Sequence, residues 1–243
     1  MTVTLGETPL GRVGLGTNRL THTLENVAFI RDSVAAGVSL IDTAHVYTDG
    51  ESEETIGAAL ASGSVDCLVA TKGGYGSGNG RPEVLAAQIE ESLRRLRTDS
   101  IDLYYLHRPD PETPLEESLG AIKEHRDRGM IRYVGVSNVS VEQIERARQV
   151  VSIAAVQNEY NLSERTDGDV VDHCANNGIV FVPYFPLRRH RTTLAQVALA
   201  WLLRRSPATL PIPGTLSLDH LKENLAAASV ELTQDEFDAL GRA

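Results

Sequence analysis

The segment VSLIDTAHVY (38–47) decides the fold, because it joins a short apolar run to a carboxylate, Asp42, at the end of that run. The same arrangement recurs twice: LVAT (68–71) precedes Lys72, and LYYL (103–106) precedes His107. Near-continuous apolar runs of this length are typical of parallel strands that are covered on both faces. Further runs of this kind follow at residues 133–136, 154–156, 180–183 and 210–212.

Segments with helical periodicity separate most of these runs, at residues 24–36, 83–97, 115–128, 141–150, 194–204 and 218–228. With residues 12–16 as a first strand, the chain contains eight strand–helix units. Eight such units predict an α/β fold, the closed (β/α)8 TIM barrel, whose active site forms at the C-terminal ends of the strands. An open doubly wound sheet is the alternative, but the glycines of GLGTN (14–18) do not have the spacing of its phosphate-binding turn.

The composition predicts one domain that spans residues 1–243. The chain is 42% hydrophobic, and no Pro/Ser-rich linker or block of charge divides it. A chain of this length can bury a substantial core. It is close to the lower edge for a barrel of this type, which typically has about 250 residues.

The net charge of −10 argues against nucleic acid or an anionic membrane as a partner, because both require a concentrated basic surface. No segment approaches the roughly 18 apolar residues of a membrane span, and we expect a cytoplasmic protein. The one dense basic cluster, RRHR (188–191), is interpreted either as a solvated loop or as a phosphate or substrate contact. Cys67 and Cys174 lack metal-ligand spacing and are predicted to be reduced structural thiols.

Four polar side chains are predicted to meet at the mouth of the barrel. Asp42, Lys72 and His107 stand at strand ends, and Tyr47 follows Asp42 by five residues, in the loop above that mouth. Taken singly, each has an ordinary structural interpretation, such as a solvated amine or a hydrogen-bonded histidine. Together they bring a carboxylate, an ammonium, an imidazole and a phenol into one cleft.

This combination suits acid catalysis at a carbonyl group. An ammonium near a phenol favours the phenolate, so Lys72 is expected to lower the pKa of Tyr47 from its ordinary value of about 10. Asp42 would hold Lys72 charged and oriented, and His107 would hydrogen-bond the oxygen that Tyr47 protonates. No residue is a convincing covalent nucleophile, so the reducing electrons would come from a nicotinamide hydride.

The segments that carry these residues resemble the aldo-keto reductase superfamily, and the similarity covers nearly the whole chain. The similar segments include IDTAHVYTDGESEETIGAAL (41–60), VATKGG (69–74), SLRRLRTDSIDLYYLHRPD (92–110), GMIRYVGVSN (129–138) and PIPGTLSLDHLKENL (211–225). The resemblance implies a (β/α)8 fold, NADPH-dependent reduction of an aldehyde or ketone as the small-molecule substrate without a metal, and a catalytic tetrad of Asp42, Tyr47, Lys72 and His107.

The same resemblance implies a cofactor site, among whose contacts Asp42 is also counted. Ser137, Asn138 and Gln157 would hydrogen-bond the nicotinamide carboxamide, and Tyr184 would stack on its ring. Structural alternatives remain open, because Ser and Asn also make good helix N-caps and a tyrosine can pack in the barrel. The path to the pyrophosphate would be lined by Thr17, Phe185 and Leu187. The adenosine end would be held by Gly214, Thr215, Leu216, Ser217, His220, Glu223 and Asn224.

The sequence departs from the family pattern in two places. Where many relatives carry a basic pair for the 2′-phosphate, this chain has Gly214 and His220, so NADP(H) is favoured and NAD(H) is possible. After the seventh strand, only four residues separate Pro186-Leu187 from a helix beginning at Thr192, so the long loop that commonly covers the cofactor is shortened. A wider site or weaker cofactor retention would follow, and lost phosphate contacts could be replaced by Arg188, Arg189 or Arg191.

Two other functions are considered beside the reductase. A regulatory or scaffold protein could bind a nicotinamide cofactor and turn over slowly, because the covering loop is short. A metal-dependent hydrolase would use Asp42, His45, His107 and His173, although His173 belongs to a helical segment and not to a strand end. The pocket walls that can be placed, at residues 47–52, 75 and 108–114, do not define one substrate shape.

Overall fold

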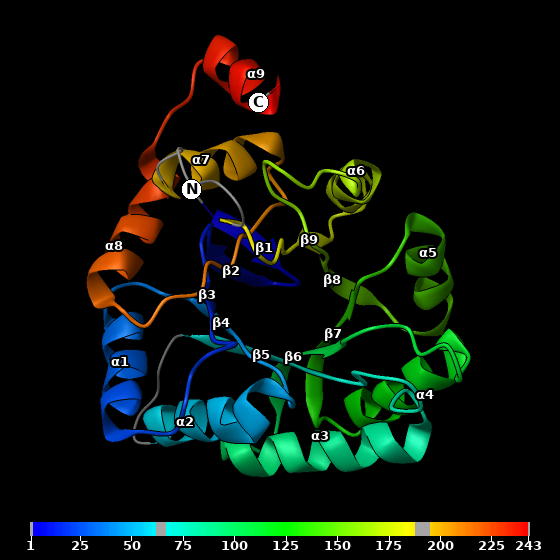
Figure 1. Cartoon of the computed structure of the whole chain (residues 1–243). Coiled ribbons are helices and arrows are strands. Elements are labelled where there is room, and N and C mark those ends of the chain that lie inside the picture. The colour runs from blue at the N-terminus through cyan, green and yellow to red at the C-terminus, as the bar shows by residue number, and fades with distance from the viewer. Residues whose placement is uncertain (1, 62–66, 188–194, 243) are drawn as a thin grey trace.

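The computed structural model describes residues 2–61, 67–187 and 195–242 of the chain. Within these residues, seven parallel strands form one sheet that curls into a barrel (Figure 1). Neighbours in the sheet are also neighbours in the sequence, as repeated βα units require. The strands are β3 (Leu15–Gly16), β4 (Leu40–Asp42), β5 (Leu68–Gly73), β6 (Ile101–Leu106), β7 (Ile131–Ser137), β8 (Ile153–Gln157) and β9 (Val180–Phe181).

Helices surround the barrel on its outside (Figure 1). Ser140 begins one of them with a capping box, in which its side chain and that of Gln143 each accept a hydrogen bond from the other residue's backbone. None of the helices in the described part of the chain is long and apolar enough to span a bilayer. These helices are α1 (Leu24–Ala35), α2 (Glu51–Leu60), α3 (Pro82–Leu96), α4 (Leu115–Asp127), α5 (Val141–Val150), α6 (Gly168–Asn176), α7 (Ala195–Arg205), α8 (Leu218–Ala226) and α9 (Gln234–Arg242), with 3-10 turns η1 (Tyr47–Gly50) and η2 (Ala227–Ser229).

Residues 209–214 lie between β9 and β3, where an eighth strand was predicted. Leu210 N donates to Phe181 O at 2.8 Å on one side, and Gly16 N donates to Pro213 O at 3.2 Å on the other. The two prolines of this segment have no N–H, so it makes isolated bridges and no continuous ladder. The eighth position of the barrel is therefore filled as predicted, but by an irregular segment.

An antiparallel hairpin that the sequence analysis did not predict precedes the barrel, with strands β1 (Thr2–Leu5) and β2 (Thr8–Gly11). Its buried side chains, Val3, Leu5 and Leu10, pack against residues of the barrel interior. Gly11 N donates to the hydroxyl of Ser39 at 2.8 Å, and Ser39 directly precedes β4, so the hairpin lies at the N-terminal end of the strands. The opposite, C-terminal end stays available for a site.

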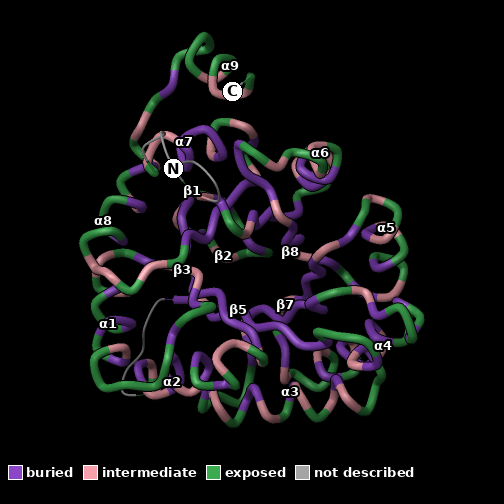
Figure 2. The backbone as a smooth tube through the Cα atoms, in the orientation of Figure 1, coloured by how far each residue is buried: buried purple, intermediate pink, exposed green. Residues whose placement is uncertain are grey.

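Two apolar cores hold the barrel together, one on each face of the sheet. Figure 2 shows that most of the barrel strands are buried. Along β6, Leu103 and Tyr105 belong to the inner core, whereas Tyr104 and Leu106 belong to the larger core beneath the helices. This alternation follows from the two-residue period of a strand, and it explains why the strands read as continuous apolar runs. All four side chains are fully buried.

Candidate active site

The two-residue period of the strands places three ionisable side chains inside the mouth of the barrel. In β5, Ala70 belongs to the inner core, so Lys72 two residues later points the same way. Asp42 pairs in register with Ala70, and Lys72 pairs with Tyr105, so the strands are staggered around the barrel. His107 follows Tyr105 by two residues and continues the same inner face. The predicted convergence of Asp42, Lys72 and His107 is therefore present.

Lys72 and Asp42 form a buried ion pair. Lys72 Nζ lies 2.6 Å from Asp42 Oδ1, with the two side chains 0% and 2% exposed. The ammonium also donates to Thr43 O at 2.6 Å, and Gln157 Nε2 donates to the second carboxylate oxygen, Oδ2, at 2.8 Å. Both charged groups are thus hydrogen-bonded by neutral partners as well as by each other, as a buried pair requires. The sequence analysis did not foresee that Gln157 supports Asp42.

Burial and the ion pair act in opposite directions on the pKa values of Lys72 and Asp42. Burial alone would lower the pKa of Lys72, but the adjacent Asp42 carboxylate and Tyr47 raise it above its ordinary value. Burial raises the pKa of Asp42, and the attraction of Lys72 and the hydrogen bond from Gln157 oppose that rise. Lys72 is therefore a cation with a fixed position at neutral pH.

Tyr47 lies above this pair at the start of η1. The turn takes left-handed backbone angles at Thr48 (φ 47°) and Asp49 (φ 54°), and Thr48 Oγ1 donates to Leu20 O at 2.8 Å, which fixes the turn. Lys72 Nζ stands 3.5 Å from the Tyr47 hydroxyl and 4.9 Å from its ring centroid.

The predicted net fall in the pKa of Tyr47 was wrong. Burial raises the pKa of this phenol above its ordinary value, and the charge of Lys72 offsets that rise only in part. The nearby Asp42 carboxylate adds to the rise, because it too disfavours a phenolate. Tyr47 is therefore a protonated phenol at neutral pH.

His107 forms the other side of the mouth. Its ring meets that of Tyr47 edge-on, with 6.1 Å between centroids, and that of Tyr75 at 4.8 Å. Burial, with the charges of Lys72 and Arg108, lowers the pKa of His107 to about 3. The imidazole is consequently neutral at physiological pH and keeps one N–H to donate.

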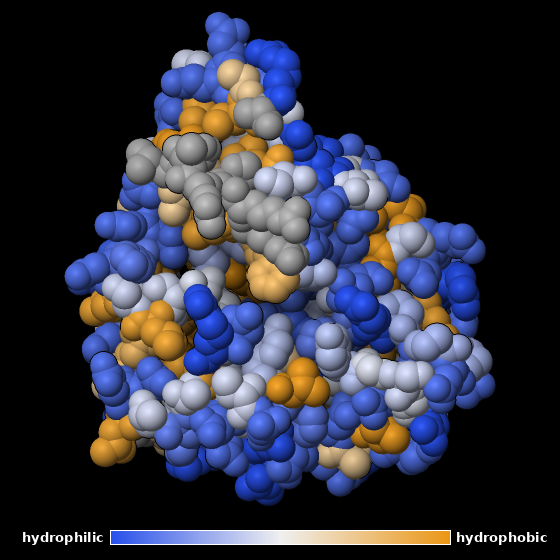
Figure 3. All heavy atoms as spheres, viewed as in Figure 1, coloured by the Kyte–Doolittle hydropathy of each residue, from blue (hydrophilic) through white to orange (hydrophobic). Residues whose placement is uncertain are grey.

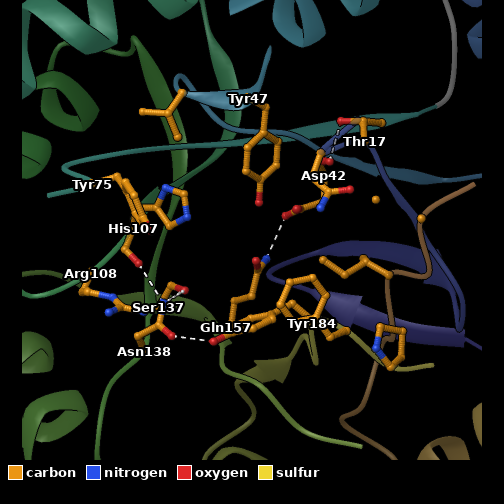
Figure 4. Close-up of a pocket in the computed structure, with 17 residues that line it drawn as sticks. Thr17, Asp42, Tyr47, Tyr75, His107, Arg108, Ser137, Asn138, Gln157 and Tyr184 are labelled. Atoms are coloured by element: carbon orange, nitrogen blue, oxygen red, sulfur yellow. Dashed lines mark hydrogen bonds between the residues drawn. The ribbon is translucent and has the colours of Figure 1, made fainter. Parts of the chain in front are cut away.

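A cavity of about 380 Å³ opens at this end of the barrel. Figure 3 shows a hollow near the centre of a mostly hydrophilic face, and Figure 4 shows the side chains that converge on the cavity. Asp42, Tyr47 and His107 line it, whereas the fully buried Lys72 lies behind them. The cavity is also lined by Gly16, Thr17, Asn18, Val46, Tyr75, Arg108, Ser137, Asn138, Gln157, Tyr184, Phe185, Pro186, Ile212 and Gly214.

Several predicted nicotinamide contacts are gathered along one wall of this cavity (Figure 4). Tyr184 Oη donates to Asn138 Oδ1 at 2.8 Å, and Asn138 Nδ2 donates to His107 O and to Ser137 Oγ, each at 3.0 Å. Asn138 has left-handed backbone angles (φ 59°), which asparagine tolerates better than most residues and which turn the chain out of β7. Ser137 and Asn138 thus do not cap α5, whose N-cap is Ser140.

The residues predicted for the phosphates and the adenosine are more dispersed. Thr17 lines the cavity, but its hydroxyl donates to Asp42 O at 2.8 Å. Leu187 packs against the core beneath the helices, and Arg188, Arg189 and Arg191 lie outside the described residues. The lining includes none of the other predicted adenosine contacts, which are Thr215, Leu216 and Ser217 before α8 and His220, Glu223 and Asn224 within it.

The start of α8 has a hydrogen-bonded cap of its own. Ser217 Oγ accepts from His220 N at 3.4 Å, and Thr215 Oγ1 accepts from Ser217 N at 3.0 Å. His220 and Glu223 are exposed, whereas Asn224 is buried. The adenosine role of these residues stays a prediction.

The sequence analysis missed five lining residues. Gly16, Asn18, Val46, Pro186 and Ile212 face the cavity, whereas Tyr75 and Arg108 were already placed on its walls. Val46 directly precedes Tyr47, and Ile212 lies in the irregular eighth position, so both positions were available from the barrel pattern. A glycine or an asparagine in a loop carries no comparable sequence signal.

The residues of the considered hydrolase do not gather at one point. His173 on α6 lies 3.0 Å from Glu145 on α5, and His45 Nδ1 lies 3.3 Å from Arg95 Nη1. Among the described residues, no group of three or more His, Cys, Asp or Glu side chains could hold a metal ion.

The two cysteines have the properties of structural thiols. Cys67 and Cys174 are buried and unpaired, and burial raises the pKa of each to about 12. A thiol with so high a pKa is protonated at neutral pH and therefore a poor nucleophile.

Comparison with known proteins gives one consistent result. The profile of the aldo/keto reductase family matches residues 12–189 and 187–243. Pyridoxine 4-dehydrogenase of Escherichia coli K12 is 34% identical over 98% of this chain and 96% of its own length. An uncharacterized oxidoreductase of Schizosaccharomyces pombe is also 34% identical, over 98% of this chain and 88% of its own length.

Solved structures give the same answer. The thermostable aldo-keto reductase Tm1743, in complex with the inhibitor epalrestat, has a TM-score of 0.90 at 33% identity, covering 100% of this chain and 99% of that one. An aldo/keto reductase of Klebsiella pneumoniae in complex with NADP and acetate has a TM-score of 0.88 at 30% identity, covering 99% and 94%.

The predicted (β/α)8 barrel and the predicted resemblance are both confirmed by these comparisons. The two profile matches meet at residues 187–189, where the shortened loop was predicted. The chain belongs to the aldo/keto reductase family.

Proposed function

We propose that this protein is an NAD(P)H-dependent oxidoreductase that reduces an aldehyde or a ketone to the alcohol, with Tyr47 as the general acid. The observation that carries the proposal is the buried ion pair of Lys72 and Asp42, whose ammonium stands 3.5 Å from the Tyr47 hydroxyl. Tyr47 faces a cavity that a small carbonyl compound can enter. Family membership supports the same reaction class.

Each residue of the predicted tetrad has a separate role in protonating the substrate oxygen. Tyr47 begins as a protonated phenol and transfers its proton to the oxygen as negative charge develops there. The charge of Lys72 stabilises the phenolate that remains, and Asp42 holds that charge in position. His107 is neutral and can donate its N–H to the same oxygen.

The wall opposite Tyr47 fits a nicotinamide ring and its carboxamide. A carboxamide needs both donors and acceptors, which Ser137, Asn138 and Gln157 provide at the cavity surface. The Tyr184 ring offers an apolar face beside them, held by its bond to Asn138. A reduced nicotinamide bound there supplies the hydride.

The remaining cofactor contacts belong to the same proposal. Gly214 leaves bare backbone in the wall, and a Cβ added there would meet Gly16 O at 3.3 Å. Beyond Gly214, the start of α8 would take the phosphates and the adenosine. We expect NADPH to bind more tightly than NADH, because His220 would contact the 2′-phosphate. The cytoplasmic location stays a prediction of the sequence.

A regulatory or scaffold protein that only binds the cofactor is the second candidate. The complete set of Asp42, Tyr47, Lys72 and His107 disfavours it, because binding alone has no need for a charged pair beside a phenol. Burying that pair carries a desolvation cost, which a role in proton transfer explains.

The test is a fluorescence titration of the purified chain with NADPH and NADH, followed by NADPH absorbance with a panel of aldehydes and ketones. Pyridoxal belongs in the panel, because one relative is named pyridoxine 4-dehydrogenase. Binding with substrate-dependent oxidation is the expected result. Tight binding without oxidation of NADPH by any carbonyl compound would favour the regulatory protein, and absence of binding would contradict both candidates.

A further inference from the structure

Arg108 is a free cation at the mouth of the catalytic cavity. It follows His107 directly, is exposed, and lines the cavity together with Tyr75 and Asn138. It also lines two further hollows beside the cavity, of about 260 and 540 Å³, so it stands where all three meet. Among the described residues it has no hydrogen-bond or ion-pair partner.

Two carboxylates near Arg108 already have other hydrogen-bond partners. They are Asp110, two residues further along the chain, and Asp167, which lines one of these hollows. Asp110 accepts four hydrogen bonds, from Gly78 N at 3.0 Å, Gly80 N at 2.8 Å, Glu112 N at 3.0 Å and Thr113 Oγ1 at 2.9 Å.

Asp167 lines the second of these hollows with Arg108, and it accepts from Asn158 Nδ2 at 2.8 Å. Asp110 and Asp167 thus accept hydrogen bonds from loop residues. Neither is paired with the guanidinium.

Arg108 lies on the Tyr75 side of the cavity, where Ser137 and Asn138 are the proposed cofactor contacts beside it. Figure 4 shows Arg108 and Tyr75 on one side of the cavity and Thr17 on the other, with Gln157 and Tyr184 between them. The charge of Arg108 is nevertheless close enough to His107 to help lower the pKa of that ring. Tyr75 and Val46, both exposed, add apolar surface to the same cavity.

We propose that Arg108 binds a carboxylate or phosphate group of the carbonyl substrate, so that the preferred substrates are anionic aldehydes or ketones. This inference rests on the proposed reductase function and names its substrate class. A guanidinium presents two parallel N–H donors that match a carboxylate or a phosphate. In a chain with a net charge of −10, an anionic substrate needs such a local cation to enter.

The test compares 4-formylbenzoate with its methyl ester, which have the same ring and aldehyde and differ in the charge. The ester group withdraws electrons more strongly, so intrinsic reactivity favours the ester, and a preference for the acid must come from binding. We measure kcat and KM for both compounds in the wild-type chain, in Arg108→Gln and in Arg108→Lys. Arg128→Gln is the matched control, because Arg128 is an exposed arginine at the C-terminal end of α4, remote from the mouth.

We expect the wild-type chain to prefer the acid over the ester. Arg108→Gln should lower kcat/KM for the acid by about tenfold or more, mainly through KM, because a charge-assisted hydrogen bond is lost. The ester should change less than about twofold, Arg108→Lys should retain part of the preference, and Arg128→Gln should retain all of it.

Calorimetry with terephthalate and the NADP⁺-loaded chain gives a second readout, which does not depend on turnover. We expect Arg108→Gln to weaken this binding and to leave the Kd for NADPH unchanged. Equal losses for acid and ester, or a raised Kd for NADPH with an unchanged acid-to-ester ratio, would overturn the proposal. If no aldehyde or ketone of the panel is turned over, the reductase function fails, and the calorimetric comparison still decides whether Arg108 binds an anion.

Discussion

Removing the charge of Asp42 should destabilise the protein strongly, because it leaves the ammonium of Lys72 buried without its counter-ion. Lys72 is 0% exposed and lies 2.6 Å from the carboxylate. Breaking a buried pair by neutralising one partner costs roughly 3–5 kcal/mol, because the remaining charge is uncompensated. For a chain of this size, such a loss lowers Tm by about 10 °C. Asp42→Asn keeps the shape and an acceptor for Gln157, so the charge is what changes.

The assay is urea unfolding of Asp42→Asn, Lys72→Met and the double variant, each at pH 7 and pH 10. We expect the double variant to be more stable than Asp42→Asn, because it buries no charge.

The pH dependence follows from the pKa of Lys72. Without Asp42, burial lowers its folded-state pKa below that of the unfolded chain, so the unfolded state binds more protons between the two values. The stability of Asp42→Asn relative to wild type should therefore rise from pH 7 to pH 10. Single losses below about 1 kcal/mol that simply add in the double variant would refute the reasoning.

Two further variants test other parts of the site. The pKa of His107 is about 3 in the folded state and about 6.5 when unfolded, so the unfolded state binds more protons between these values and the folded state loses stability as pH falls. His107→Gln should reduce the loss of unfolding free energy between pH 7 and pH 5 by roughly 2 kcal/mol, and an unchanged loss would contradict a buried neutral imidazole. Asp110→Asn should cost roughly 2 kcal/mol of unfolding free energy, because one of two oxygens that accept from the 78–80 loop is lost. It should also raise KM, because Tyr75 lies just before residues 78–80 and its ring packs against that of His107 in the cavity wall. A normal KM in the destabilised variant would show that this loop does not position Tyr75.

The barrel and its mouth were predictable because one short-range rule governs both. Side chains alternate along a strand, so a polar residue at the end of an apolar run, such as Asp42 or Lys72, must continue one face of that run. Repetition of the rule in successive strands then brings His107 to the same place. Tyr47 was also found, because it lies a few residues beyond such a strand end.

The hairpin at residues 2–11 carried a readable signal that was missed. Its residues alternate in burial, and Gly6 at the turn has φ 58°, which is typical of glycine in a tight hairpin. The irregular eighth position also had a signal, because the prolines at 211 and 213 exclude a regular ladder.

The pKa of Tyr47 could not be predicted, because its direction depends on the balance of two opposing terms. The attraction of Lys72 is implied by the sequence, whereas the extent of burial that outweighs it is a property of the folded loop. The hydrogen bond from Gln157 to Asp42 joins residues 115 positions apart and likewise needs the closed barrel. Long-range polar contacts of this kind have no local sequence pattern.

The most direct test of the central claim is turnover by Tyr47→Phe, measured with the Kd for NADPH in the same preparation. The substitution removes one hydroxyl and keeps the ring, so we expect the cavity and the cofactor affinity to be unchanged. Loss of general acid catalysis should lower kcat by about 10²-fold or more. A Tyr47→Phe enzyme that binds NADPH normally and reduces its best aldehyde at the wild-type rate would show that Tyr47 is not the acid.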